Sequence, residues 1–388
     1  MILNKQNSVT RNPQTRNKVV HWLSFGLWAV ALLVIAPSLL SPFDLNLLGK
    51  FLAYAIVALG LDLIWGYTGM LSLGQGLFFG LGAYCIAMYT QLEQAGGKLP
   101  DFMGLYGVTA LPALWQPFHS PVFAIGAAIL VPMFVASILG FMVFRSRVQG
   151  VYFSIITQAL TAITSLLLID QLNLINGTNG LPINYSKTLM GFPLNRPGTK
   201  IGIYLITAVC LGISYLLCRA LVNSRFGKLL IAIRDDETRL RFVGYNPVYI
   251  KVIVFALSAG LAGLAGALFF PQGGIISPAA LGIVPSIEIV IWVAVGGRGT
   301  LIGAFLGAVL VNEAKNQISS SNPNTWTLIM GALFVGVVLL FPNGIVGLVK
   351  SLSAYASRRM KKSAVDSFNP DSELSRDGEA LPKSVELT

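Results

Sequence analysis

Three glycine-rich stretches place polar side chains inside long apolar runs of this sequence. They read GYTGMLSLGQGLFFGLGAY (66–84), PQGGIISPAALGIVPSIE (271–288) and GGRGTLIGAFLGA (296–308). Glycine and proline loosen the helical backbone there, beside Ser72, Gln75 and Glu288. Irregular backbone at membrane depth is tolerated only where protein buries it or where it lines a water-filled cavity. The stretches predict a path for a polar solute; the alternative is close helix packing, which uses glycine just as often.

Covalent and metal chemistry find no support in the sequence. Two scattered histidines, His21 and His119, cannot complete a Ser-His-Asp or Cys-His arrangement. The three cysteines lie within apolar runs and show no metal-ligand spacing. No Gly-x-x-x-x-Gly-Lys-Ser/Thr phosphate cradle occurs, so the chain does not bind ATP by that device. We therefore expect no enzyme, no metal site and no cofactor bound by this chain.

Acidic side chains inside apolar runs form a second group of candidates. They are Asp62, Asp170, Glu288 and Glu313. Intramembrane charge is a functional hypothesis by default, but all four lie near predicted helix ends, where the interface could solvate them. Glu288 is the strongest of them, because it follows a broken segment and precedes the apolar run IVIWVAV.

The longest charged interruption is NSRFGKLLIAIRDDETRLRFVGYNP, from Asn223 to Pro247. It carries an apolar stripe at the i, i+3, i+4, i+7 spacing of one helical face: Phe226, Leu229, Leu230 and Ile233. Arg225, Lys228 and Arg234 lie off that stripe. The pattern predicts a short amphipathic helix at a membrane surface. Such a helix either docks against a partner or is a solvated loop whose basic residues only set topology.

Composition sets the class of protein to which these features belong. Of 388 residues, 54% are hydrophobic and 11% charged, against roughly a quarter charged in ordinary globular domains. The formal charge of +11 does not indicate nucleic acid, because the basic residues stand in blocks between apolar spans. The sequence predicts an all-α, polytopic transmembrane helical bundle in a lipid bilayer.

About ten spans are expected, some of them re-entrant or broken. They lie near 22–40, 47–65, 70–90, 122–144, 150–170, 201–218, 252–270, 281–296, 300–315 and 326–341. With both termini cytoplasmic, the basic 219–251 loop also lies inside, as the distribution of lysine and arginine requires. We expect a cytoplasmic arm (1–20), a membrane domain (21–350) with a retained first helix, and a disordered cytoplasmic tail (351–388).

Four sequence blocks carry a resemblance to a known family. They are GxxSLGQGxFFGxGAY, SRFGKLLIAIRDDE, AGLAGAL and VGGRGTLIGAFLGA. Together they resemble the LivM-like permease subunits of ABC importers for branched-chain amino acids, over most of residues 47–348. Within that family, NGTNGL, LMGFPLN, FVGYNP and SIEIVIWVAVGGRGT look most like the urea importer's second permease, the UrtC type.

The resemblance implies a heteromeric importer in the bacterial plasma (inner) membrane. Two different permeases would form the pathway, two ATPase subunits would bind ATP and Mg beneath it, and a periplasmic or extracellular binding protein would deliver substrate. The loop matching Ser224–Phe242 would carry the coupling helix that sits in a cleft of the ATPase. The implied coupling residues are Ser224, Arg225, Phe226, Gly227, Leu229, Leu230, Ile233, Arg234, Asp235 and Asp236. The apolar stripe would dock, and the charges would fix its register.

The substrate that this resemblance favours is urea, which is small, neutral and polar. A pathway for urea needs amides, hydroxyls or carbonyls and no strong fixed charge. The path candidates are Ser72, Gln75, Gln158, Asn176, Thr178, Asn179 and Glu288, with Thr157 and Thr161 beside them; ordinary interhelical hydrogen bonding is the alternative for each. A branched-chain amino acid importer is the nearest rival. A stand-alone channel or secondary transporter and a purely structural subunit are rivals of other classes.

Overall fold

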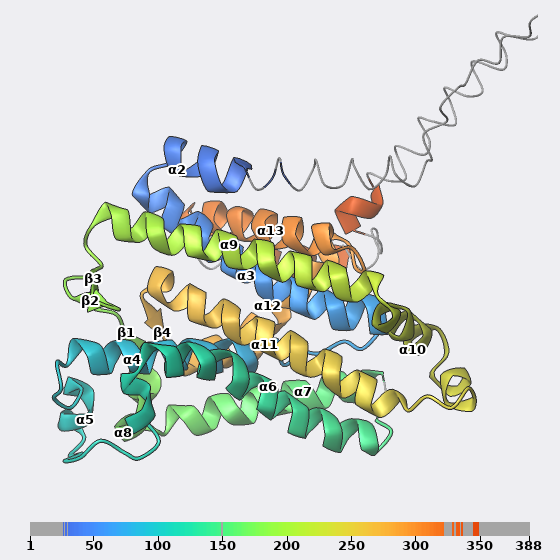
Figure 1. Cartoon of the computed structure of the whole chain (residues 1–388), viewed down its shortest axis with the longest axis horizontal. Helices are drawn as coiled ribbons and strands as arrows, with labels where there is room; N and C mark the ends of the chain where they lie inside the picture. The colour runs from blue at the N-terminus through green and yellow to red at the C-terminus, as the bar shows by residue number, and fades with distance from the viewer. Residues whose placement is uncertain are drawn as a thin grey trace, which may run out of the picture.

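The structure, a computed structural model, describes residues 30–148 and 150–321 and short pieces at 26, 28, 328–329, 331–333, 335–336 and 344–348. The predicted arm (1–20) and tail (351–388) lie outside the described residues. The described chain is almost wholly helical, which confirms the all-α class (Figure 1).

Its helices are joined by short loops and by two minimal sheets. The helices before the charged stretch are η1 (Ala31–Ile35), α2 (Ala36–Leu39), α3 (Pro42–Thr68), α4 (Gln75–Gln94), α5 (Asp101–Leu105), η2 (Gln116–His119), α6 (Pro121–Arg145), α7 (Val151–Ile169), α8 (Leu172–Ile175), η3 (Gly177–Asn179) and α9 (Pro197–Asn223). Those that follow are α10 (Arg225–Phe242), α11 (Pro247–Gly273), η4 (Pro278–Leu281), α12 (Ile283–Gly296) and α13 (Leu301–Ser321). In antiparallel register, β1 (Leu181–Pro182) pairs with β4 (Ile275–Ile276), and β2 (Thr188–Leu189) pairs with β3 (Phe192–Pro193).

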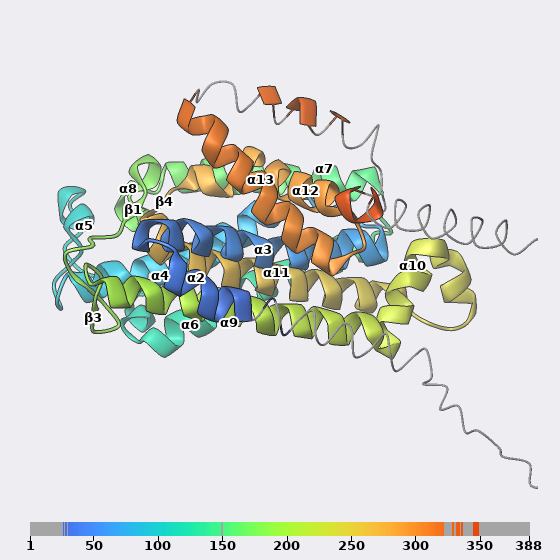
Figure 2. The same ribbon diagram turned by 90° about the horizontal axis from the view of Figure 1, so that it is seen from above.

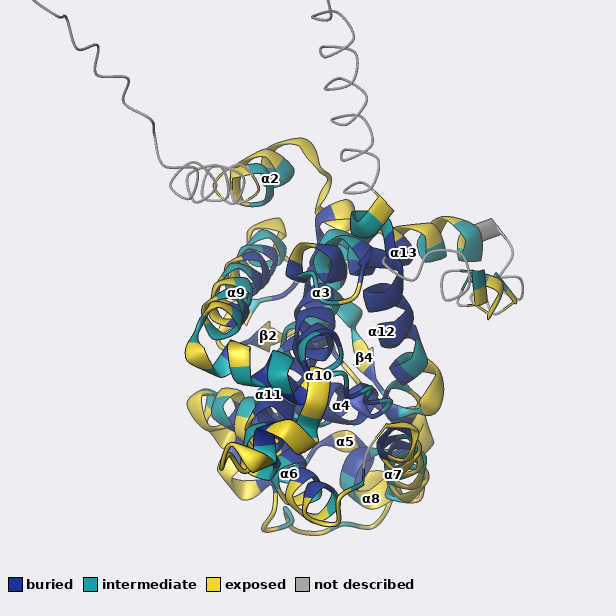
Figure 3. Cartoon of the chain, turned by 90° about the vertical axis from the view of Figure 1, so that its right-hand side faces the viewer, coloured by how far each residue is buried: buried dark blue, intermediate teal, exposed yellow. Residues whose placement is uncertain are grey.

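Two helices, α3 and α11, form the centre of the bundle. They pack against each other, α11 also packs against α4 and α6, and α3 packs against α9 and α13 (Figure 3). Glycine permits a close crossing of α4 and α11, because a Cβ at Gly82 of α4 would lie 2.0 Å from the Gly263 carbonyl oxygen of α11. Small residues at helix crossings let backbones approach in this way within membranes.

Five helices of the described residues are long and apolar enough to cross a membrane: α3, α6, α7, α9 and α11. The most apolar windows of α3 and α11 are 78% and 61% buried, whereas those of α6, α7 and α9 are 22–33% buried. The outer three helices thus expose apolar faces, as lipid or a partner subunit would require. A sixth span results if α12 and α13, bent by 119°, are counted together. The ten-span topology, with both termini inside, stays a prediction.

The predicted breaks in the helices are present. Gly69, in the left-handed conformation with φ +77°, ends α3, and irregular backbone then leads to Gln75, where α4 begins. Gly274 (φ +82°) ends α11 in the same way, before β4 and η4 lead into α12. The third break separates α12 from α13 at residues 297–300. Each glycine-rich stretch therefore contains a real interruption of the helical backbone.

The two ends of the bundle differ in content. One end carries α10, to which α9 leads and from which α11 departs (Figure 2). The opposite end carries α5, α8 and the strand pairs (Figures 1 and 2). Basic side chains of α6, of the loop after it and of α10 gather at the α10 end, where Arg145, Arg147 and Arg241 line one cavity. The orientation in which that end faces the cytoplasm stays a prediction.

Candidate functional site

The charged stretch folds as helix α10, which the sequence pattern predicted. Ser224 caps it: its hydroxyl accepts hydrogen bonds from the backbone N–H groups of Phe226 and Gly227 at 3.1 and 3.4 Å. Asp236 interrupts it with extended backbone (φ −162°, ψ 98°), so α10 consists of two short helices across a kink. The apolar spacing of the first helix gave no indication of this kink.

The apolar stripe of α10 faces the protein's own bundle. Leu230 is 0% exposed and Ile233 5% exposed, and α10 contacts α3, α9 and α11. Phe226 is half-buried and packs against the same core, and Leu229 is half-buried. Leu230 and Ile233 are thus covered by this chain itself rather than open to a partner, and the coupling role of α10 stays a prediction.

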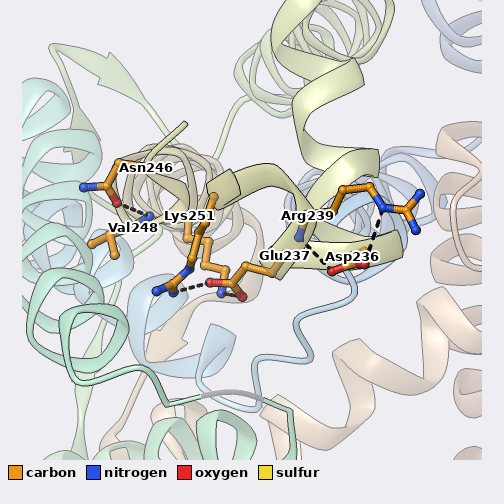
Figure 4. A network of polar contacts seen from close by, with 7 residues as sticks. Asp236, Glu237, Arg239, Asn246, Val248 and Lys251 are labelled. Carbon is orange, nitrogen blue, oxygen red and sulfur yellow. Dashed lines mark hydrogen bonds and ion pairs between the residues drawn. The ribbon is translucent and has the colours of Figure 1, made fainter. Parts of the chain in front are cut away.

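An ion-pair network fastens the second half of α10 to α11. The carboxylate of Glu237 accepts hydrogen bonds from Lys251 of α11 and, at 2.7 Å, from Arg241 one turn further along (Figure 4). Burial alone would raise the pKa of Glu237, but the hydrogen bonds and positive charges of Lys251 and Arg241 outweigh it and hold that pKa below 4.5. Beside this group, Asp236 pairs with Arg239 at 3.6 Å.

Two arginines connect α10 and the α12–α13 break to the end of α3. Arg234 of α10 donates to the Gly66 carbonyl at 3.0 Å, and Arg298 of the break donates to the Trp65 carbonyl at 3.1 Å. These carbonyls belong to the last turn of α3, where backbone acceptors run short of helical donors; the Trp65 carbonyl also accepts from the Gly69 N–H at 3.2 Å. In return, Asp62 accepts a hydrogen bond from the Gly299 N–H at 2.7 Å. The end of α3 thus joins the charged helix to a broken helix.

The outward face of α10 and of the turn after it carries charge and uncovered aromatic surface. Arg225, Lys228, Asp235 and Arg239 are exposed. Phe242 is 87% exposed, and Val243, Tyr245 and Tyr249 are exposed as well. An apolar surface of this kind next to charges is typical of an interaction site. The residues free to meet a partner are therefore different from the stripe that periodicity singled out.

The first broken segment, residues 69–74, and the first turn of α4 are held by hydroxyl groups from two other helices, α7 and α12. Ser154 and Thr157 of α7 bind the Leu71 carbonyl and the Leu73 N–H at 2.6 and 3.1 Å. Ser286 of α12 accepts from the Gly76 N–H at 3.1 Å. Ser72 is fully buried, and its hydroxyl accepts from the Gly74 N–H at 3.3 Å. These groups satisfy backbone that the break leaves without helical partners.

Gln75 differs from its neighbours because part of its amide has no partner. Its Nε2 donates to Ser258 of α11 at 3.2 Å, while Oε1 is buried and accepts no hydrogen bond within the described part of the chain. A buried amide oxygen without a donor is costly and could accept from the N–H of a polar solute. Among the predicted path residues at the first break, Gln75 keeps the clearest capacity to bind a ligand.

The predicted path residues of the 176–179 loop lie elsewhere, beside the second broken segment. Asn176, in the left-handed conformation, donates to the Gly180 carbonyl at 2.7 Å and stabilises its own turn. Thr178 and Asn179 are exposed. Leu181, just after this loop, pairs with Ile276 in the strand pair next to η4. The structure therefore does not bring this group together with Gln75.

Gln158 and Glu288 differ in whether their side chains have hydrogen-bond partners in the described residues. Gln158 is half-buried on α7, and no hydrogen bond to its amide occurs within the described residues. Glu288 is 9% exposed and accepts two hydrogen bonds of 2.7 Å from Lys315 of α13. The expectation that the interface solvates the acids near helix ends is wrong for Glu288 and for Asp62, which is 0% exposed. Glu288 is neutralised within the chain rather than left as a free charge.

Several residues that complete these sites were missed by sequence reasoning. They are Ser154, Glu237, Ser258, Arg298 and Lys315; Ser286 lies in the second glycine-rich stretch, but its partner was not predicted. Opposite charge gave two usable signals: Glu288 and Lys315 both stand in apolar helices that follow each other, and Glu237 and Arg241 have the i, i+4 spacing of a helical ion pair. The remaining contacts join positions up to 233 residues apart and leave no trace in local spacing.

Comparison with known proteins decides the family. The family model described as branched-chain amino acid transport system / permease component matches residues 44–338. The chain belongs to this permease family. The matched range includes all three breaks, α10 and α13, so the features described above are those of a transport permease. No solved structure gives a significant match.

Relatives of the permease carry different substrate names. The chain is 28% identical to the high-affinity branched-chain amino acid transport system permease protein LivM of Escherichia coli K12, over 84% of this chain and 75% of the relative. It is 25% identical to BraD of Pseudomonas aeruginosa, a permease of the same description, over 76% and 91%. The ribose import permease protein RbsC of Escherichia coli K12 is 26% identical over 57% and 68%. Similarity at this level shows the family and leaves the substrate open.

Proposed function

We propose that this permease is one of two permease subunits of an ATP-driven importer in the bacterial inner membrane. It pairs with a second permease, two ATP-binding subunits and an external substrate-binding protein. The observation that carries this proposal is α10, a charged helix with an uncovered outer face that two arginine contacts and the end of α3 link to the broken helices. A channel or secondary transporter working alone has no need of such a surface.

In this function α10 passes force from the ATP-binding subunit to the pathway. The partner contacts the exposed side of α10 and the Phe242–Tyr249 turn, while the buried stripe keeps the helix seated on the bundle. Arg234 then moves the end of α3, and Asp62 and Arg298 carry the movement to the α12–α13 break. The residues that transmit force are those whose hydrogen bonds cross between elements.

We propose urea as the substrate. Uncharged hydrogen-bonding groups at the first break support this choice, since Gln75 presents a buried acceptor there and the acid Glu288 is paired with Lys315. A branched-chain amino acid is the second candidate, which the printed names of the LivM and BraD relatives favour. Its ammonium and carboxylate groups would each need a charged or strongly polar partner.

The test is uptake of labelled urea and labelled leucine, in a strain lacking only this gene and in proteoliposomes of the assembled complex. We expect ATP-dependent urea uptake that disappears with the gene and returns with it. Leucine uptake in its place would assign the second candidate. The permease alone should give no flux above empty vesicles; ATP-independent flux would contradict the importer function itself.

A further inference from the structure

A basic cavity of about 420 Å³ opens at the α10 end of the bundle, between α6, α10 and α11. Three arginines line it: Arg145 at the end of α6, Arg147 in the turn that follows, and Arg241 of α10. Arg241 is paired with Glu237. For Arg145 and Arg147, the described residues offer no carboxylate within ion-pair distance. The cavity thus carries positive charge that the described part of the chain does not neutralise.

A stripe of exposed apolar side chains on α6 runs to the mouth of this cavity. Leu130, Phe134, Ile138 and Phe141 follow each other at intervals of three and four residues, and all are exposed. Phe141 also lines the cavity, and the Arg145 guanidinium lies 5.6 Å from the centre of its ring. On the other side of the cavity, Tyr249 and Ile253 of α11 expose apolar surface one turn apart.

We propose that this cavity binds the phosphate of an anionic phospholipid whose acyl chain lies along the α6 stripe. The arginine fork matches a phosphate group, and basic pockets between transmembrane helices on the cytoplasmic side suit anionic headgroups. A lipid carries both parts in the required order, with its phosphate at the interface and its chains in the hydrocarbon layer. An acidic surface of the ATP-binding subunit would cover the arginines but leave the stripe on α6 uncovered.

Occupancy of this site bears on the charged helix, because Arg241 is shared between the cavity and the Glu237 network. A bound phosphate draws on the same guanidinium that helps to hold α10 against α11. Binding of an anionic lipid therefore changes the strength of the contact between α10 and α11. This consequence rests on the proposed importer function, whereas lipid binding itself does not.

The test measures lipid retained by the full-length permease, with native mass spectrometry after titration with phosphatidylglycerol or phosphatidylcholine. The variant is Arg145→Gln/Arg147→Gln. The control is Lys228→Gln/Arg239→Gln, which removes the same charge from exposed positions at the same end. At about 1 kcal/mol for each basic residue near the surface, the variant should bind phosphatidylglycerol roughly 30-fold more weakly. The control should bind like the wild type, and phosphatidylcholine should bind weakly to all three.

Three results would overturn the proposal. The first is equal phosphatidylglycerol binding by the variant and the wild type. The second is displacement of phosphatidylglycerol by excess inorganic phosphate, which would make a soluble anion the ligand. The third is loss of co-purifying ATP-binding subunits from the variant while its lipid binding stays unchanged, which would make the cavity a protein interface. Because binding is measured without transport, it can succeed or fail independently of the uptake experiment.

Discussion

Helix α10 and the first broken segment use polar residues in opposite ways. On the outer face of α10 the charged groups stay at the surface, while Leu230 and Ile233 hold the helix on the bundle. In the broken segment the polar groups are buried: Ser154 and Thr157 bond to its irregular backbone, and Ser286 bonds to the first turn of α4. A charged residue on the outer face of α10 is thus available to a partner, whereas a polar one at the break is mostly engaged in building the fold.

Residues available for function are therefore recognised differently at the surface helix and at the buried break. At the surface, the residues outside the periodic pattern are free to make contacts, as Phe242 and Lys228 show. At the break, the residues with unused hydrogen-bonding capacity are the exceptions, namely Gln75 and Gln158. We therefore expect functional residues where a side chain is not already engaged in packing or hydrogen bonding within the fold. The following predictions test that rule, beginning with the largest expected effect.

Leu230→Asp should unseat α10 from the bundle. The change forfeits the burial of a leucine, worth roughly 1.5–3 kcal/mol, and forces an unpaired carboxylate against apolar helices. We expect faster proteolysis within residues 223–247, measured on the purified permease, and no uptake by the complex. For proteolysis Lys228→Gln is the matched control, because Lys228 is exposed and lies off the buried stripe. Normal proteolysis and uptake in Leu230→Asp would show that the stripe does not anchor the helix.

The next largest effect should come from the Glu288–Lys315 pair. Removing one partner of a buried ion pair costs about 3–5 kcal/mol; the lower end applies here, because the Lys315 side chain is 36% exposed. Glu288→Gln should lower thermal stability, and Glu288→Gln/Lys315→Met should recover most of it. If the pair is structural, uptake recovers in the double variant together with stability. A stable double variant without uptake would instead place Glu288 on the path.

These two cases show how far the sequence could lead. The spacing of Leu230 predicted an amphipathic helix correctly, because a 3.6-residue period depends on neighbours along the chain. The spacing could not show what covers the stripe. An apolar stripe looks the same in sequence whether it packs on the protein's own helices or on an ATPase subunit. Glu288 was identified by its rarity in an apolar run, while its partner lies on the next helix and became evident only when α12 and α13 were packed.

At the broken segments too, local sequence predicted the backbone but not the groups that contact it. Glycine and proline around Gly69 and Gly274 predicted the interruptions, because such residues favour backbone that a helix excludes. The donors and acceptors that satisfy the backbone around the Gly69 interruption come from α7 and α12, up to 210 residues away. Local sequence therefore predicts where a helix breaks. Only the packing of distant helices determines which groups hydrogen-bond to the backbone at the break.

Protonation of Glu237 should loosen the second half of α10 in acid. Because hydrogen bonds from Lys251 and Arg241 hold the pKa of Glu237 below 4.5, the folded state binds this proton less readily than the unfolded state. The stabilisation is fully present above pH 4.5 and is lost as the pH falls through the lowered pKa. Hydrogen bonds to charged groups contribute about 1.5–3 kcal/mol each, so the protection factors of the amides in 237–242, taken relative to intrinsic exchange at each pH, should fall in acid. Glu237→Gln should show lowered protection already at neutral pH, with little further change on acidification.

The smallest effects on stability should separate Ser286 from Gln158. Ser286→Ala leaves the buried Gly76 N–H without its acceptor, at a cost of about 1–2 kcal/mol. The change should lower the melting temperature. The substrate affinity of the complex that remains folded should be unchanged. Gln158→Ala removes no hydrogen bond within the described residues, so the melting temperature should stay constant. If Gln158 faces the path, its loss lowers uptake at low substrate concentration. Unchanged uptake with unchanged stability would instead make Gln158 a bystander and leave Gln75 as the candidate on α4.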